Sequence, residues 1–247
     1  MVEPDTSVLT SGARMRLRVA AFVVVAVGVV TWDGLAPRLH PVSVWPEVAI
    51  IAAGVLPATL LLIYLALPLW SSRRVVPMIF AAFLIGAVVS WETHHYLTSN
   101  FMKFGAYACG GWMFLWVFEE LAWVVLIALI IPIVDTISVA AGPTHTIVHH
   151  HFEIYSAVAV AFVAPGGPAA GLGPPDILFF ALFLAATVRW GLRPGWTWLA
   201  MTGMYSLTLV IANATDVSGL PALPFLSAGF LLANCDLLWR RFRRRRA

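Results

Sequence analysis

Residues 120–141 read ELAWVVLIALIIPIVDTISVAA, an apolar run that contains one internal carboxylate, Asp135. The run has about the 20 residues that an α-helix needs to cross the hydrocarbon core of a bilayer. A charged side chain at that depth is expensive, so its presence requires a structural or functional reason. The stretch therefore predicts a transmembrane helix that carries an acidic group near one end.

The composition of the whole chain extends this prediction. Of its 247 residues, 61% are hydrophobic and only 11% are charged, whereas soluble domains are about 25% charged. We therefore expect an all-α polytopic membrane protein and not a soluble enzyme. The net charge of +3 comes mainly from an arginine run at 240–246, which follows an apolar segment. Arginine in that position is typical of a cytoplasmic membrane flank, so no nucleic-acid partner is expected.

Eight apolar segments are candidate membrane spans. They cover residues 19–32, 44–70, 75–96, 101–116, 120–141, 176–190, 196–213 and 220–239. With eight spans, the basic pairs Arg73–Arg74 and Arg189–Arg193 fall on the same side as the two arginine-rich termini. Because cytoplasmic loops are enriched in Lys and Arg, both termini are expected in the cytoplasm and the connection 142–175 outside.

A second acidic residue follows this connection. Residues 171–176 read GLGPPD, and Asp176 opens the next apolar run. Proline suits the first turn of a helix, so Asp176 is expected just inside a helix start. Taken singly, Asp135 has an alternative role as a structural carboxylate, and Asp176 as an acidic residue favoured by the helix dipole. Together they are expected at similar depth on adjacent antiparallel helices, where paired carboxylates can activate water.

A third feature lies at the start of the last span. Residues 219–224 read GLPALP. Proline there interrupts the helix and leaves backbone groups free, which membrane proteins tolerate where a cavity is nearby. Taken alone, the segment is an ordinary proline-bounded helix start.

In this order, the three features resemble the presenilin and signal peptide peptidase family of intramembrane aspartyl proteases, in a bacterial or archaeal form. Pro221, Ala222 and Leu223 match the third family motif in full, and the resemblance covers roughly residues 120–239. Two positions differ. Val134 stands where the family usually has Tyr, and Pro175 replaces the second Gly of the Gly-x-Gly-Asp motif. The family has nine spans, so one N-terminal span would be absent here.

The resemblance implies a division of the chain and a set of roles. Residues 1–118 would form N-terminal transmembrane helices, and residues 119–247 a catalytic core with the outer loop 142–175. The implied catalytic residues are Asp135 and Asp176, and the implied substrate-binding residues are Gly171, Gly173, Pro221, Ala222 and Leu223.

The expected partners are the lipid bilayer, here a prokaryotic plasma membrane, and transmembrane or signal-peptide-like helices. No metal or cofactor is required, and the oligomeric state is left open. The apolar piece 154–163 is too short to span and is expected to be an interfacial segment or an edge strand that pairs with an extended substrate.

Two other functions fit the same sequence. Intramembrane carboxylates also serve proton relays, so a non-proteolytic protein on this scaffold, either a substrate-binding chaperone or a proton or solute pathway, is the main alternative. The second is a metalloenzyme that uses His145, His149, His150 and His151, since histidines four residues apart share a helix face.

Overall fold

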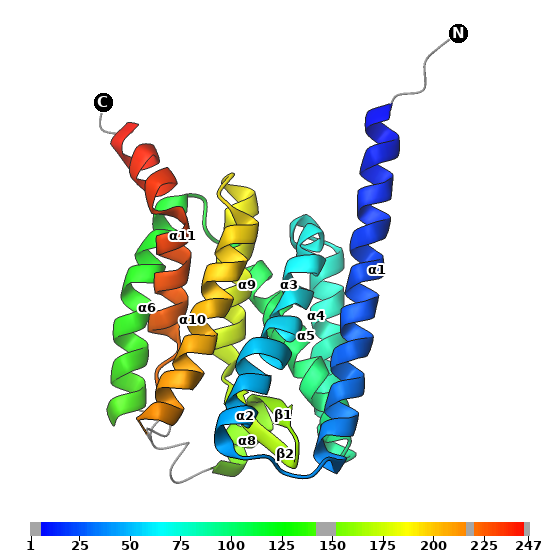
Figure 1. The fold of residues 1–247 in the computed structure, drawn as a ribbon. Helices are drawn as coiled ribbons and strands as arrows, with labels where there is room; N and C mark the ends of the chain where they lie inside the picture. The colour runs from blue at the N-terminus through cyan, green and yellow to red at the C-terminus, as the bar shows by residue number, and fades with distance from the viewer. Residues whose placement is uncertain (1–5, 142–151, 216–219, 245–247) are drawn as a thin grey trace.

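The structure is a computed structural model that describes residues 6–141, 152–215 and 220–244. Figure 1 shows long helices that run roughly side by side, with a small β-hairpin at one end of the bundle. The two ends of the described chain, near residues 6 and 244, both lie at the opposite end. These two ends of the bundle are called the hairpin end and the terminal end below.

The longer helices are α1 (Thr6–Leu35), α3 (Leu56–Ala66), α4 (Val75–Glu92), α5 (Tyr96–Leu115), α6 (Leu121–Ala141), α9 (Pro174–Arg189), α10 (Pro194–Ala214) and α11 (Leu223–Arg244). The shorter elements are helices α2 (Val44–Ile50) and α8 (Phe152–Val158) and strands β1 (Val160–Ala164) and β2 (Gly167–Leu172). A π-helical turn over Ile51–Val55 joins α2 to α3, and a 3-10 turn over Leu67–Ser71 extends α3. Residues 44–71 therefore act as one helical segment.

The outward-facing side chains of the bundle are largely apolar. Val24 of α1, Ile85 of α4 and Ile133 of α6 are 71%, 65% and 61% exposed, which a protein surrounded by water rarely allows over such areas. Four helical segments of the described residues are long and apolar enough to cross a membrane: Gly12–Arg38, Val44–Ser71, Val75–Glu92 and Leu121–Val139. The mainly α-helical fold is thus confirmed, and these segments support a membrane protein. The count of eight spans stays a prediction.

Helix α9 lies at the centre of the bundle. Ile177 and every residue from 180 to 186 are completely buried, and α5, α6, α10 and α11 all contact the helix. Phe183 stacks on Phe230 of α11 with ring centroids 4.8 Å apart. A helix that is apolar on all sides is buried in this way because it has no face for water. The core around α9 draws on both predicted parts of the chain, 1–118 and 119–247.

The contact between α5 and α9 depends on a glycine. A Cβ atom at Gly111 would collide with the carbonyl oxygen of Leu178 and would lie 3.1 Å from the Cβ of Ala181. The backbones of α5 and α9 can approach this closely only because position 111 has no side chain.

The predicted outer loop 142–175 contains regular structure in its described part. The apolar piece 154–163 is divided between α8 and β1, so it is neither wholly an interfacial segment nor wholly a strand. β1 pairs with β2 in antiparallel register, with an irregularity between Phe162 and Val163. The turn between them passes through Gly166 at a φ of 101°, which favours glycine. β2 then leads through Gly173 directly into α9.

We expect Gly111→Ala to lower the free energy of unfolding by about 1–3 kcal/mol, because overpacking at this contact pushes α5 away from α9. Gly203→Ala in α10 is the matched control. A Cβ there meets no atom within 4 Å, and alanine favours a helix. Thermal unfolding of the purified protein in detergent measures both variants. Equal melting temperatures for Gly111→Ala and the parent would contradict the close contact.

Candidate functional site

Asp135 lies on the side of α6 that faces the bundle. Its side chain is half-buried, whereas its neighbours Val134 and Thr136 are exposed. Thr136 Oγ1 donates a hydrogen bond of 2.7 Å to the carbonyl oxygen of Pro132, one turn earlier in the same helix. The tyrosine position of the family's first motif, occupied here by Val134, therefore points away from the bundle.

The carboxylate of Asp135 binds the start of α11. Its Oδ2 accepts a hydrogen bond of 3.1 Å from the backbone N–H of Leu223, the first residue of that helix. The first N–H groups of a helix have no partner within the helix and carry partial positive charge. Asp135 therefore caps α11, and the Pro221-Ala222-Leu223 segment meets the first predicted aspartate across 88 positions of sequence.

Asp176 is fixed by the start of its own helix. It is the third residue of α9, and its Oδ2 accepts a hydrogen bond of 2.8 Å from the N–H of Gly173. Pro174 and Pro175 occupy the first two helical positions, where a backbone N–H would have no partner within the helix. Proline in place of the second glycine of the motif is thus compatible with this helix start.

The two carboxylates belong to one site. Asp135 and Asp176 interact electrostatically, and both carboxyl groups interact electrostatically with the hydroxyl group of Tyr205 of α10. The Tyr205 hydroxyl donates a hydrogen bond of 2.9 Å to the carbonyl oxygen of Asp176, and its buried ring stacks on Phe180. Helices α6, α9, α10 and α11 therefore all contribute to the site.

Tyr155 of α8 approaches the same site from the hairpin. Burial and the negative charge of Asp176 together raise the pKa of its phenol. Its hydroxyl donates a long hydrogen bond of 3.4 Å to the carbonyl oxygen of Gly171 on β2. Sequence reasoning missed both Tyr155 and Tyr205. The available signal for Tyr205 was its hydroxyl within the predicted span 196–213, since a buried tyrosine hydroxyl needs a hydrogen-bond partner.

One edge of the hairpin pairs with no strand among the described residues. The side chain of Asn100 donates to the carbonyl oxygen of Ala161 and accepts from its N–H, each at 2.8 Å, on the edge of β1 away from β2. Ala161 and its partner Gly171 therefore form a non-hydrogen-bonded pair. It follows that the N–H and C=O of Gly171 face the far edge of β2, which pairs with no other strand among the described residues.

The predicted metal ligands are not part of the site as the structure describes it. The histidines at 145 and 149–151 fall outside the described residues. Within the described part of the chain, no three His, Cys, Asp or Glu side chains lie together as metal ligands would.

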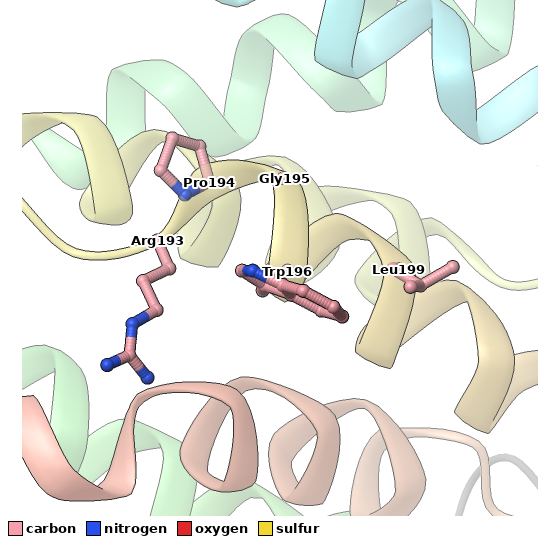
Figure 2. A pocket seen from close by; sticks show the side chains of 5 residues that line it. All are labelled: Arg193, Pro194, Gly195, Trp196 and Leu199. Atoms are coloured by element: carbon pink, nitrogen blue, oxygen red, sulfur yellow. The ribbon is translucent and has the colours of Figure 1, made fainter.

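Figure 2 shows a hollow of about 510 Å³ at the terminal end, lined by Arg193, Pro194, Gly195, Trp196 and Leu199. Arg193 donates hydrogen bonds of 2.9 and 2.7 Å to the two carboxylate oxygens of Asp236 on α11. From Asp176 to Arg189 at the end of α9 the helix rises by roughly 20 Å, so this hollow at the terminal end lies well away from Asp176. It is therefore not part of the aspartate site.

No family model, curated protein or solved structure matches this chain. The functional argument therefore depends on the geometry of the site.

We expect Asp176→Asn to lower the pKa of Tyr155 towards its ordinary value. The negative charge of Asp176 disfavours the tyrosinate, so its removal makes deprotonation easier, while burial still keeps the pKa raised. Fluorine NMR of fluorotyrosine-labelled protein, with the signal assigned by Tyr155→Phe, follows the titration. Asp236→Asn at the terminal end is the control. An identical Tyr155 titration in Asp176→Asn and parent protein would contradict the proximity of these two groups.

Proposed function

We propose that this protein is an intramembrane aspartyl protease that cleaves transmembrane or signal-peptide-like helices. One observation carries the proposal: Asp135 binds the N–H of Leu223 and interacts electrostatically with Asp176. Three segments that resemble the presenilin and signal peptide peptidase motifs thereby meet at one place. Most pairs of acidic residues far apart in sequence have no such common site.

The two carboxyl groups are suited to hydrolysis by general acid–base catalysis. The first, ionised, takes a proton from water while the water oxygen adds to the peptide carbonyl carbon. The second, protonated, gives its proton to the carbonyl oxygen. The resulting diol collapses when the C–N bond breaks. The first carboxyl group then protonates the leaving nitrogen, and the second recovers a proton from the diol. The products are a carboxylic acid and an amine, and no cofactor takes part.

A helical substrate hides its peptide bonds, so a protease must hold an extended segment. The far edge of β2 pairs with no other strand among the described residues and presents the N–H of Gly171 for β-strand addition, while the Gly171 C=O would have to exchange its long hydrogen bond from Tyr155 for one from the substrate. The expectation that the piece 154–163 pairs with the substrate stays a prediction; in the structure Asn100 occupies the outer edge of β1 at Ala161, so we place the substrate on β2. β2 leads within a few residues to Asp176, so a strand paired there runs towards the carboxylates.

The arrangement of basic residues supports an orientation of the bundle. Arg73 and Arg74 precede α4, and Arg189 and Arg193 lie between α9 and α10; both connections lie at the terminal end (Figure 1). Under the positive-inside rule this end faces the cytoplasm. The proposal includes eight spans, with α5, α9, α10 and α11 crossing beside the four most apolar segments, and both chain termini in the cytoplasm.

Reporter fusions test this topology. Fusions after Arg73 and at either terminus are expected to report a cytoplasmic location, and a fusion at residue 149 an outer location. A cytoplasmic reporter at residue 149 would contradict the count of eight spans, because it would put the termini and the hairpin end on the same side.

We expect Asp135→Asn and Asp176→Asn each to reduce cleavage of a model transmembrane peptide by at least about a hundredfold, because an amide cannot perform the proton transfers. The assay uses purified protein in lipid vesicles, with protein amount and melting temperature measured for each variant. Asp236→Asn removes a carboxylate at the terminal end and is expected to cut at the parent rate. If either site variant cuts at the parent rate, the non-proteolytic chaperone or proton-pathway function replaces this proposal.

A further inference from the structure

A second cavity lies at the hairpin end, about 920 Å³ in volume. Part of its lining comes from the hairpin, with Ala161 and residues 168–171, whose side chains are small or absent. Asp33 of α1, Trp91 of α4 and Lys103 of α5 also line it. The volume remains because alanine, glycine and proline along β2 do not fill it.

Among the residues that line this cavity, Asp33 is the one whose burial requires an explanation. Its side chain is only 6% exposed, and its Oδ1 has no hydrogen-bond partner among the described residues. A buried carboxylate without a partner is strongly unfavourable. A neighbouring cavity of about 10 Å³ beside Asp33 has room for at most one water. That water would supply a hydrogen bond but no positive charge.

Lys103 lines the same cavity but forms no ion pair with Asp33 in the described structure. Its Nζ donates hydrogen bonds of 3.4, 3.2 and 2.6 Å to the carbonyl oxygens of Ser156, Ala157 and Ala159. These three bonds use all the protons of the ammonium group, and the carbonyls at the end of α8 offset its charge. No ion pair between Lys103 and Asp33 forms in the described structure, where Arg193–Asp236 is the salt bridge. Among the described residues, Asp33 thus has no cationic partner, and its Oδ1 has no hydrogen-bond donor.

We propose that this cavity is a subsite for one basic side chain, Lys or Arg, of the substrate peptide; the inference rests on the proposed proteolytic function. The position of the cavity favours a peptide as the occupant, because residues 168–171 of β2 line it and the N–H of Gly171 lies on the edge of β2 that pairs with no other described strand. A strand paired with that edge directs alternate side chains to the same face of the sheet. One of them enters the cavity.

The recognition chemistry is specific. The cationic end of the side chain donates to Asp33, and its methylene stem lies against the aromatic rings of Trp91 and Tyr96, which also line the cavity. Lys and Arg are rare at the outer ends of transmembrane helices. A subsite for them therefore selects a minority of helices as substrates.

Binding to a protein that cannot cut tests the subsite separately from catalysis. The protein is the full chain with Asp135→Asn and Asp176→Asn. The probes are fluorescent, otherwise uncharged transmembrane peptides in which a single Lys is moved along the outer half, each paired with a Gln counterpart. At one position the Lys peptide is expected to bind about tenfold to a hundredfold more tightly than its Gln counterpart, as for a hydrogen bond between charged groups.

Asp33→Asn is expected to abolish this preference, and Asp33→Lys to reverse it in favour of a Glu peptide. Glu92→Gln, which removes an exposed carboxylate at the end of α4, is the matched control and keeps the preference. Equal binding of Lys and Gln peptides at every position would overturn the subsite, as would a preference that survives Asp33→Asn. So would an Asp33-dependent stabilisation by ethanolamine lipids without any peptide preference, since the lipid amine would then be the occupant.

The two proposals fail separately. A parent protein that cuts peptides without regard to charge keeps the protease and loses the subsite. A parent protein that binds Lys peptides through Asp33 and never cuts them keeps the subsite and loses the protease.

Discussion

A carboxylate placed among transmembrane helices must find hydrogen-bond donors, and the architecture of this bundle supplies them from helix starts. Asp135 accepts from the first N–H of α11, and Asp176 accepts from the N–H that precedes α9. Helix starts are the positions where backbone donors remain unused. The site therefore requires α9 and α11 to begin at the same depth, close to the inward face of α6. Pro174 and Pro175 in the first turn of α9, and Pro221 just before α11, favour these starting points.

The same requirement explains why α9 is central. Helix α9 brings its first turn to the site and is surrounded by α5, α6, α10 and α11, so the residues between its two ends are mostly apolar. The close contact at Gly111 holds α5 against it, and the Tyr205 hydroxyl ties α10 to the backbone of Asp176. The hairpin lies directly before α9, so an extended chain bound to β2 is aligned with the site. The packing of the other helices around α9 thus fixes the positions of both carboxylates.

The sequence predicted those parts of the site that depend on position along the chain. Asp135, Asp176 and Leu223 lie at the ends of apolar runs, and their order alone brings them to one end of a bundle. The sequence did not predict β2, because residues 167–172 read GPAAGL and contain none of the β-branched or aromatic residues typical of strands. Pairing with β1 forms this strand. Asp33 directly follows the predicted span 19–32, at a position where charge is tolerated, but α1 extends to Leu35 and packs against β1, and the carboxylate is buried there.

The central claim is that Asp135 and Asp176 act as one catalytic pair, and a peptide analogue with a hydroxyl group in place of the scissile carbonyl tests it most directly. Such a compound resembles the diol intermediate, and transition-state analogues bind far more tightly than substrates. The measurement is the dissociation constant of a hydroxyethylene peptide for the purified protein and for each single Asn variant. The account predicts saturable binding by the parent that is weakened at least about tenfold in both variants. Binding that is absent from the parent, or unchanged when either aspartate is replaced, would contradict it.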